Sequence, residues 1–313
     1  MGKIAFVFPG QGSQTVGMAK DVYENVSSSR HVFETADEKL GFSLSSLIFD
    51  GPDTELKQTK NTQPALLTAS IALYEALREK GITADYAAGH SLGEYSALVA
   101  AGVMSFEDAV AVVRARGTFM EEAVPGGRGA MAAVLGADRD QLAQLCEKIS
   151  AQGKDYLVEL ANLNSPGQIV VSGLKDGVAQ LIDRVKEAGA KRAIPLEVSG
   201  PFHTSLMKEA AARLGDQLSS VELRDAGIPV VANVTAEPVT EGEVIRDLLV
   251  QQVYSSVKWE DTVVWLIDQG VDTFVEIGPG SVLSGLIKKV SRTVTVYNVN
   301  SLDSLNALAD ELK

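Results

Sequence analysis

Residues that cross-link a chain or coordinate metal ions are scarce in this sequence. A single cysteine, Cys146, stands among 313 residues, so no internal disulfide can form. Neither a cysteine-based zinc cluster nor a secreted disulfide scaffold is therefore expected. Only three histidines are present, which limits the metal ligands and the catalytic bases that the chain can supply. We predict no metal site.

Positive charge and long apolar runs are also in short supply. Lysine and arginine total 28 against 41 aspartates and glutamates, a formal net charge of −13. Such an acidic chain is a poor general binder of nucleic acid or of anionic membranes. No apolar run approaches the roughly 18 residues of a membrane helix, and the N-terminal run stops at Pro9, unlike a signal peptide. We predict a cytoplasmic protein.

What the sequence does contain is an alternation of strand and helix patterns around ordinary globular composition. Strands alternating with helices predict a mostly parallel sheet covered on both faces. The expected strands are 4–8, 84–88, 229–234 and 273–277, and the expected helices are 59–80, 94–101, 105–123 (opened by a Ser105–Asp108 capping box), one from residue 206 and one ending before Gly270.

A glycine-rich stretch at residues 126–129 separates a segment with a different rhythm. Its expected order is strand, helix, strand, strand, helix, strand, which is the ferredoxin-like arrangement. These elements are expected at 130–135, 139–152, 157–163, 168–172, 177–188 and 192–198. We therefore predict an α/β protein whose large domain comprises residues 1–126 and 199–313, with residues 127–198 inserted as a small βαββαβ subdomain.

Residues 89–93, Gly-His-Ser-Leu-Gly, match the nucleophile-elbow pattern G-x-S-x-G. A sharp strand-to-helix turn would expose the Ser91 hydroxyl, and the glycines would keep side chains out of the crowded turn. Backbone N–H groups at the start of the following helix can bind an oxyanion. The pentapeptide alone also fits an ordinary turn between a strand and a helix.

A serine nucleophile needs a base, and the histidines offer few choices. His31 lies in a polar segment that suits a surface or helix position. His90 precedes Ser91 within the turn and suits structural support. His203 lies in a loop just before a helix, where a base is easily presented, although a purely structural loop histidine fits too. No acidic third member of a triad stands out by spacing.

Arg116 falls on the apolar stripe of its expected helix, together with Val112, Val113 and Met120. A buried arginine needs an anionic partner, because an unpaired buried charge is costly. The partner is either an internal carboxylate, with a snorkelling side chain as a further alternative, or the carboxylate of a substrate.

The glycine-rich turns at residues 10–17 and 278–285 match neither G-x-G-x-x-G nor the P-loop spacing, so we predict no dinucleotide or ATP site. The backbone N–H of Gln11, directly after the first strand, suits a second oxyanion donor.

Five segments, taken together and in order, resemble the bacterial malonyl-CoA:acyl-carrier-protein transacylases of fatty-acid synthesis. They are Phe8–Gln14, Asn61–Ala65, Gly89–Ala97, Asn164–Gln168 and Glu276–Gly280. The resemblance implies an α/β-hydrolase-like large domain with an inserted ferredoxin-like subdomain, in agreement with the pattern above.

The resemblance also implies roles for individual residues. Ser91 matches the nucleophile and His203 the base. The backbone donors of the oxyanion hole match Gln11 and Leu92, the arginine that binds the malonyl carboxylate matches Arg116, and the main-chain carbonyl that orients the histidine matches Gln252. Gln63 and Phe202 are expected to line the site, and the bulk of Phe202 resembles relatives selective for malonyl over methylmalonyl groups.

The implied reaction is ping-pong transfer of a malonyl group from malonyl-CoA to the phosphopantetheine thiol of holo acyl carrier protein, through an ester on Ser91. We expect a monomer that needs no cofactor and binds neither nucleic acid nor membrane. Because carrier proteins are acidic, docking is expected at a local basic surface. The candidates are Lys191 with Arg192 and Lys288 with Lys289. A serine esterase or thioesterase and a non-catalytic acyl-binding subunit remain as alternatives.

Overall fold

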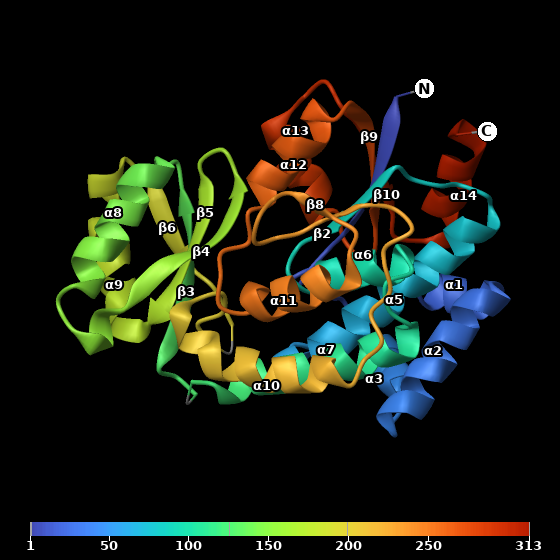
Figure 1. Ribbon diagram of the computed structural model, residues 1–313, viewed down its shortest axis with the longest axis horizontal. Coiled ribbons are helices and arrows are strands. Elements are labelled where there is room, and N and C mark those ends of the chain that lie inside the picture. Colours follow the sequence, from blue (N-terminus) through green and yellow to red (C-terminus); the bar gives the residue numbers. More distant parts are fainter. Residues whose placement is uncertain (1, 125, 199, 313) are drawn as a thin grey trace.

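Two separate sheets organise the chain, as Figure 1 shows for the computed structural model, which describes residues 2–124, 126–198 and 200–312. The larger sheet has the strand order β10-β9-β1-β2-β7-β8, and all of its neighbours run parallel except β8 against β7. Its strands are β1 (Lys3–Phe8), β2 (Tyr86–Gly89), β7 (Val230–Val231), β8 (Pro238–Val239), β9 (Val271–Ile277) and β10 (Thr295–Val299).

The central strand β1 is buried on both faces, because side chains alternate along a strand. Ala5 and Val7 pack into a cluster with helices α12 (Trp259–Asp268) and α13 (Val282–Val290). Phe6 and Phe8 point into the larger cluster on the opposite face. The sheet is thus covered on both sides, as the strand–helix alternation predicts.

The larger cluster is formed mainly with the other helices of the large domain. They are α1 (Lys20–Asn25), α2 (Ser27–Leu40), α3 (Leu44–Asp50), α4 (Asp53–Leu56), α5 (Thr59–Glu79), α6 (Leu92–Ala100), α7 (Phe106–Glu122), α10 (Lys208–Ser219), α11 (Gly242–Gln252) and α14 (Leu302–Glu311).

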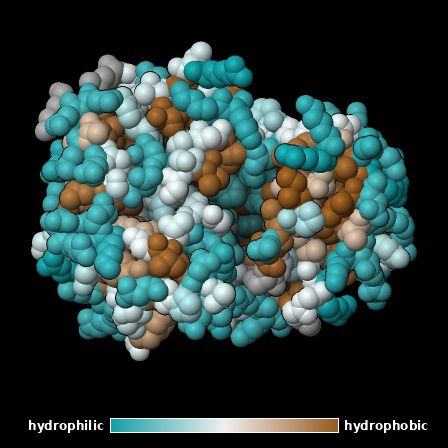
Figure 2. Space-filling view, turned by 180° about the vertical axis from the view of Figure 1, so that it is seen from behind, coloured by the Kyte–Doolittle hydropathy of each residue, from teal (hydrophilic) through white to brown (hydrophobic). Residues whose placement is uncertain are grey.

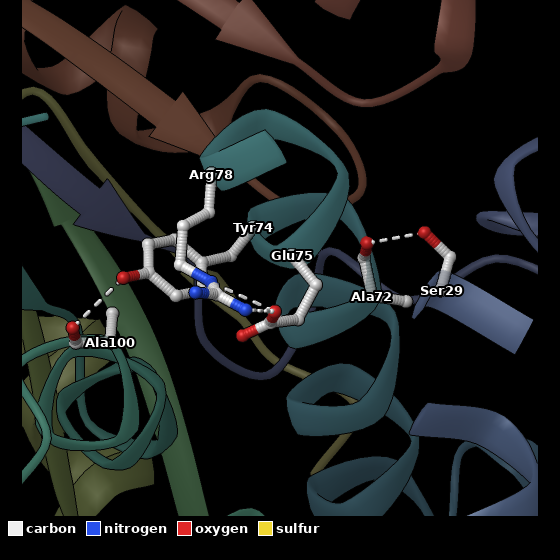
Figure 3. Close-up of polar contacts among 6 residues, drawn as sticks. All are labelled: Ser29, Ala72, Tyr74, Glu75, Arg78 and Ala100. Carbon is white, nitrogen blue, oxygen red and sulfur yellow. Dashed lines mark hydrogen bonds and ion pairs between the residues drawn. The ribbon is translucent and has the colours of Figure 1, made fainter. Parts of the chain in front are cut away.

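Helix α5 fixes its neighbours by side-chain hydrogen bonds (Figure 3). The Tyr74 hydroxyl donates to the carbonyl of Ala100, the last residue of α6, at 3.0 Å. Ser29 on α2 donates to the Ala72 carbonyl at 2.7 Å. The C-terminal end of α6 is therefore held against α5, while its N-terminal end carries the serine turn.

The second sheet is antiparallel with the order β4-β5-β3-β6, and its elements follow the βαββαβ sequence. They are β3 (Gly129–Leu135), α8 (Arg139–Ser150), β4 (Val158–Ser165), β5 (Gln168–Leu174), α9 (Lys175–Arg184) and β6 (Arg192–Pro195), with short 3-10 turns at Lys154–Tyr156 and Val185–Ala188. Cys146 is buried in the core of this lobe. The predicted fold class is confirmed. The predicted domain limits stay a prediction, and Ser199 lies outside the described residues.

The small sheet is joined to the large lobe along β4. Val257 donates its N–H to the Ala161 carbonyl at 2.9 Å and accepts from the N–H of Leu163 at 2.8 Å. The Glu159 carboxylate accepts from both the N–H and the hydroxyl of Ser205, each at 2.7 Å. The Val257 contacts tie the small sheet to the connection between α11 and α12, and the Ser205 contacts tie it to the segment that follows His203.

The sequence-based expectations are wrong about the length or number of some strands and helices. The strand expected at 229–234 shrinks to Val230–Val231, because the main chain of Asn233 bonds instead to the Glu94 side chain and to the N–H of Lys258. Two helices, α11 and α12, stand where one was expected, and β6 ends at Pro195 rather than at residue 198. Among the described residues, no helix combines the length and apolarity needed to cross a membrane.

Candidate active site

The serine turn joins β2 to α6 through close backbone contacts that only glycine permits. A Cβ atom on Gly89 would lie 2.0 Å from the backbone of Gly93, and one on Gly93 would lie 2.0 Å from the carbonyl oxygen of Phe8. Ser91 itself has φ of 51°, a left-handed value that L-residues adopt rarely. The turn therefore has the sharp geometry that the G-x-S-x-G spacing predicts.

Ser91 and His203, 112 positions apart, meet at hydrogen-bond distance. The Ser91 Oγ lies 2.8 Å from His203 Nε2. On the other side of the ring, His203 Nδ1 lies 2.9 Å from the main-chain carbonyl oxygen of Gln252. A carbonyl only accepts, so Nδ1 carries the proton and Nε2 offers its lone pair to the serine hydroxyl.

The environment keeps this imidazole neutral. Burial lowers the pKa of His203 to about 3, and the positive charge of Arg116 adds to that effect. His203 is held with φ of 59°, so the segment that presents it is strained. At neutral pH the side chain is an unprotonated base aimed at Ser91.

Arg116, on α7, is 1 % exposed and points at the same serine. Its Nη2 donates to Ser91 Oγ at 3.2 Å and to Gln252 Oε1 at 2.9 Å, and its Nη1 donates to Gln63 Oε1 at 2.8 Å. Within the part of the chain that the structure describes, no carboxylate forms a salt bridge with it and its Nε has no hydrogen-bond partner. An internal ion pair, one of the alternatives for this arginine, is therefore not formed.

A second set of residues supports the site from behind, and sequence reasoning missed it. Asn233 accepts from the N–H of Ser91 at 2.7 Å and donates to the Gly89 carbonyl at 2.7 Å. Glu94, 2 % exposed, accepts from the Gln252 side-chain amide at 2.8 Å and from the N–H of Asn233 at 3.1 Å. Glu94 lies in one of the motif segments, whereas nothing local distinguishes Asn233.

The remaining predicted residues line a cavity of about 110 Å³ at Ser91. Gln11, Leu92, Gln63 and Phe202 all contribute to its wall, together with Met120, Met131, Leu196 and Val198. Among the described residues, neither the backbone N–H of Gln11 nor that of Leu92 has a protein acceptor. Both N–H groups are therefore available to an oxygen atom in the cavity.

A second cavity of about 220 Å³ adjoins the first and shares Gln11, His90, Asn162 and Leu196 with it. It continues between the small sheet and α13, where Gln168 and Val282 line it. Figure 2 shows a furrow between the larger and the smaller lobe of the surface. An extended ligand can thus reach Ser91 from the junction of the two lobes.

The other histidines lie where the sequence places them. His90 Nε2 is 2.8 Å from Asn164 Oδ1, and its ring packs 5.8 Å from that of Trp259. His31 is exposed on α2. In the described ranges, no group of three or more His, Cys, Asp or Glu side chains can hold a metal ion. The chemistry on offer is a serine nucleophile with a neutral base beside a buried cation.

Comparisons with known proteins agree on one family. The model of the acyl transferase domain matches residues 5–308. The chain is 55 % identical over 313 residues to a malonyl CoA-acyl carrier protein transacylase of Bacillus subtilis, covering 100 % of this chain and 98 % of that protein. A crystal structure of an acyl carrier protein S-malonyltransferase from Vibrio cholerae superposes with a TM-score of 0.94 at 46 % identity, covering 98 % of this chain and 99 % of that one.

A further solved structure holds a malonyl-transacylase in complex with a type II PKS acyl-carrier protein. It matches with a TM-score of 0.95 at 44 % identity, over 99 % of both chains. With its serine turn, its histidine and its full-length similarity to these proteins, the chain belongs to the acyl transferase domain family.

Proposed function

We propose that this chain transfers a malonyl group from malonyl-CoA to the phosphopantetheine thiol of acyl carrier protein, through an ester on Ser91. One observation carries the proposal: Ser91 Oγ lies within hydrogen-bond distance of both a neutral imidazole and a buried guanidinium without a carboxylate partner. The imidazole activates a nucleophile, and the guanidinium binds an acyl group that ends in a carboxylate. The relatives named above support this substrate and this carrier.

In the first half-reaction, His203 Nε2 takes the proton of the Ser91 hydroxyl as Oγ attacks the thioester carbonyl. The carbonyl oxygen becomes an oxyanion, for which the N–H groups of Gln11 and Leu92 are the donors. When the C–S bond breaks, the imidazolium returns its proton to the departing CoA sulfur. A malonyl ester remains on Ser91, and its free carboxylate pairs with Arg116.

The second half-reaction reverses the first with a different thiol. His203 takes the proton of the phosphopantetheine thiol, whose sulfur attacks the ester, and the proton then returns to Ser91 Oγ. Thioester exchange changes no oxidation state, so we propose that no cofactor or metal takes part. All the groups named lie on one chain, which suits a monomer, and neither nucleic acid nor a membrane has a part in the reaction. A cytoplasmic location stays a prediction from the sequence.

The substrate carboxylate also tunes the base. Burial is the larger cause of the low pKa of His203 and the Arg116 charge the second. A bound carboxylate adds a negative charge beside Arg116 and offsets that second cause, so the pKa of His203 rises when the correct substrate is in place. The imidazolium that forms during attack is then less costly for malonyl than for an uncharged acyl group.

Two alternatives are weaker for specific reasons. A serine hydrolase needs water at the ester, whereas Met120, Met131, Val198 and Phe202 give the cavity an apolar wall. A non-catalytic acyl-binding subunit does not need a hydroxyl and a neutral imidazole 2.8 Å apart.

The proposal is tested by intact-protein mass spectrometry after incubation with malonyl-CoA, followed by addition of holo acyl carrier protein. We expect the wild-type chain to gain one malonyl group on Ser91 and to lose it to the carrier thiol. Ser91→Ala, which deletes only the hydroxyl, should stay folded and remain unlabelled. Release of the group as free malonate at the same rate with and without the carrier would instead identify a hydrolase, and a malonylated Ser91→Ala chain would refute the assignment of the nucleophile.

A further inference from the structure

Glu94 is a buried carboxylate that the reaction above does not use. It is the third residue of α6, 2 % exposed, and it does not line the cavity at Ser91. Its Oε2 accepts from Gln252 Nε2 at 2.8 Å and from the N–H of Asn233 at 3.1 Å. The carboxylate therefore reaches the site only through its neighbours.

The Gln252 amide has two chemically different ends, and Glu94 is the nearest of the acceptors that its NH₂ group faces. Its Nε2 donates to Glu94 Oε2 and to the Ser91 carbonyl at 3.0 Å. The carbonyl only accepts, and the carboxyl group of Glu94 keeps an acceptor oxygen in either protonation state. Its Oε1 then faces the opposite way and accepts from Arg116 Nη2 at 2.9 Å. A rotated amide would turn its NH₂ group toward the guanidinium and leave Arg116 Nη2 without this acceptor.

Glu94 and Arg116 also interact electrostatically. Burial raises the pKa of Glu94 to about 7, and the nearby Arg116 opposes that rise. No carboxylate pairs directly with Arg116 in the described residues, and the ionised form of Glu94 acts on the guanidinium across one amide group. An acceptor at position 94 is thus linked to the direction of the guanidinium through a single hydrogen-bonded side chain.

We infer that Glu94 is a positioning residue: by accepting from Gln252 Nε2, it holds the Gln252 amide in the orientation that aligns Arg116 with the substrate carboxylate. The inference rests on the proposed function, because it assigns to Arg116 the binding of that carboxylate. It requires a hydrogen-bond acceptor at position 94 and does not require a charge there.

Two substitutions separate these requirements. Glu94→Gln keeps an acceptor oxygen for Gln252 and for the N–H of Asn233. Glu94→Met keeps a similar unbranched shape and has no such acceptor. Glu276→Gln serves as the matched control, since Glu276 is also buried, accepts from the backbone N–H groups of Leu283 and Ser284, and does not line the cavity at Ser91.

The first readout is KM and kcat for malonyl transfer. The second is the rate of inactivation by phenylmethanesulfonyl fluoride. This reagent carries no carboxylate, so its rate measures the reactivity of the Ser91–His203 pair. For Glu94→Met we expect kcat/KM for malonyl-CoA to fall about tenfold or more, mostly through KM, while the inactivation rate changes less than about threefold. Glu94→Gln should return KM to within about threefold of wild type, and Glu276→Gln should leave both readouts near wild type.

The inference is overturned if folded Glu94→Met keeps the wild-type KM, or if the substitution slows malonyl transfer and inactivation equally. It is also overturned if Glu94→Gln is as impaired as Glu94→Met, because the charge rather than the acceptor would then matter. If Glu94→Met does not fold, Gln252→Met, which retains the main-chain carbonyl that bonds His203, should show the same rise in KM. A wild-type KM in that variant would also overturn it. Malonyl labelling of the wild-type chain is measured first, because its absence would overturn the proposed function itself.

Discussion

At the scale of single residues, the site consists of groups whose properties depend on their burial. Ser91, His203 and Arg116 come from three segments, and each is held by a partner that fixes its orientation. The Arg116 guanidinium is the most unusual of the three, because it is fully buried and bonds only to neutral groups. Its desolvation on folding is therefore not offset by an ionic partner. That imbalance favours a bound carboxylate.

Arg116→Ala should therefore discriminate between acyl groups. A bidentate arginine–carboxylate contact in a desolvated pocket is worth on the order of 2–5 kcal/mol. We expect kcat/KM for malonyl-CoA to fall roughly 10²-fold or more, while that for acetyl-CoA, which has no carboxylate, holds or rises. Arg116→Lys should rescue the malonyl rate only partly, because an ammonium group lacks the planar fork.

The matched control is Arg114, on the same helix and half-buried. It donates to the Lys60 carbonyl at 2.7 Å and to the Asn61 side chain, and it does not line the cavity at Ser91. Arg114→Ala should lower the melting temperature without changing the ratio of the two rates. A wild-type ratio in folded Arg116→Ala would rule out the carboxylate-binding role.

The low pKa of His203 predicts how stability depends on pH. In the unfolded chain a histidine takes up a proton below about pH 6.5, whereas folded His203 stays neutral down to about pH 3. The unfolded state therefore binds more protons between these values, so the contribution to stability is complete above pH 6.5 and is lost as the pH falls toward 3. At pH 5 the loss is about 2 kcal/mol.

This is checked with His203→Gln, which cannot take up the proton in either state. Denaturant unfolding at pH 7 and pH 5 should show a smaller loss of stability for the variant than for wild type, by about 2 kcal/mol. Equal losses in the two proteins would contradict the neutral, buried state of His203.

At the scale of elements, the serine turn is set by how closely α6 approaches β1 and β2. Gly93 lies against the carbonyl of Phe8, so the start of α6 packs on the end of β1 with no room for a methyl group. The other end of α6 is fixed by Tyr74 of α5 (Figure 3). The helix that begins directly after Ser91 is thus fixed at both ends.

Gly93→Ala should consequently be severe, because the new Cβ would lie 2.0 Å from a backbone oxygen that cannot move independently. We expect a loss of about 3 kcal/mol or more in the free energy of unfolding, together with slower acylation of Ser91. Gly285→Ala, at an exposed position of α13 where an added Cβ meets nothing within 4 Å, should instead stabilise by about 0.5–1 kcal/mol. Denaturation midpoints of the two variants provide the comparison, and a Gly93→Ala chain as stable as wild type would contradict the close packing.

At the scale of the whole molecule, two lobes meet at the serine and leave an entrance between them (Figures 1 and 2). The basic candidates for carrier docking differ in their relation to that entrance. Lys289 Nζ donates to Gln168 Oε1 at 2.5 Å. Gln168 lines the second cavity, of about 220 Å³, which adjoins the cavity at Ser91. Lys288 is bonded to the Val294 carbonyl instead. Lys289 is therefore the better candidate of this pair, and the pair Lys191 and Arg192 stays a prediction.

Reversal of this charge should weaken docking of an acidic carrier. We expect Lys289→Glu to raise the KM for holo acyl carrier protein by about threefold or more at low salt, with the KM for malonyl-CoA unchanged. Lys39→Glu, an exposed position on α2, makes the same change in net charge and should alter neither value. Equal carrier KM values for the two variants would exclude Lys289 from the docking surface.

The sequence by itself determined the layered fold and the main chemical groups. Alternating strand and helix patterns are local, so they identify a mostly parallel sheet and the inserted βαββαβ segment. The elbow glycines, Ser91 and the apolar stripe around Arg116 are equally local signals. The scarcity of histidine left His203 as the strongest candidate for the base.

Only the tertiary structure decided which groups hold these residues in place. Ser91 bonds Asn233 across 142 positions and Gln252 across 161, and no periodicity encodes such distances. The role of the Gln252 carbonyl came from a family resemblance, and its side chain, Glu94 and Asn233 were not anticipated. A hydrogen bond depends on where two polar atoms lie after packing, and packing is decided by the whole core rather than by the segment that supplies either atom.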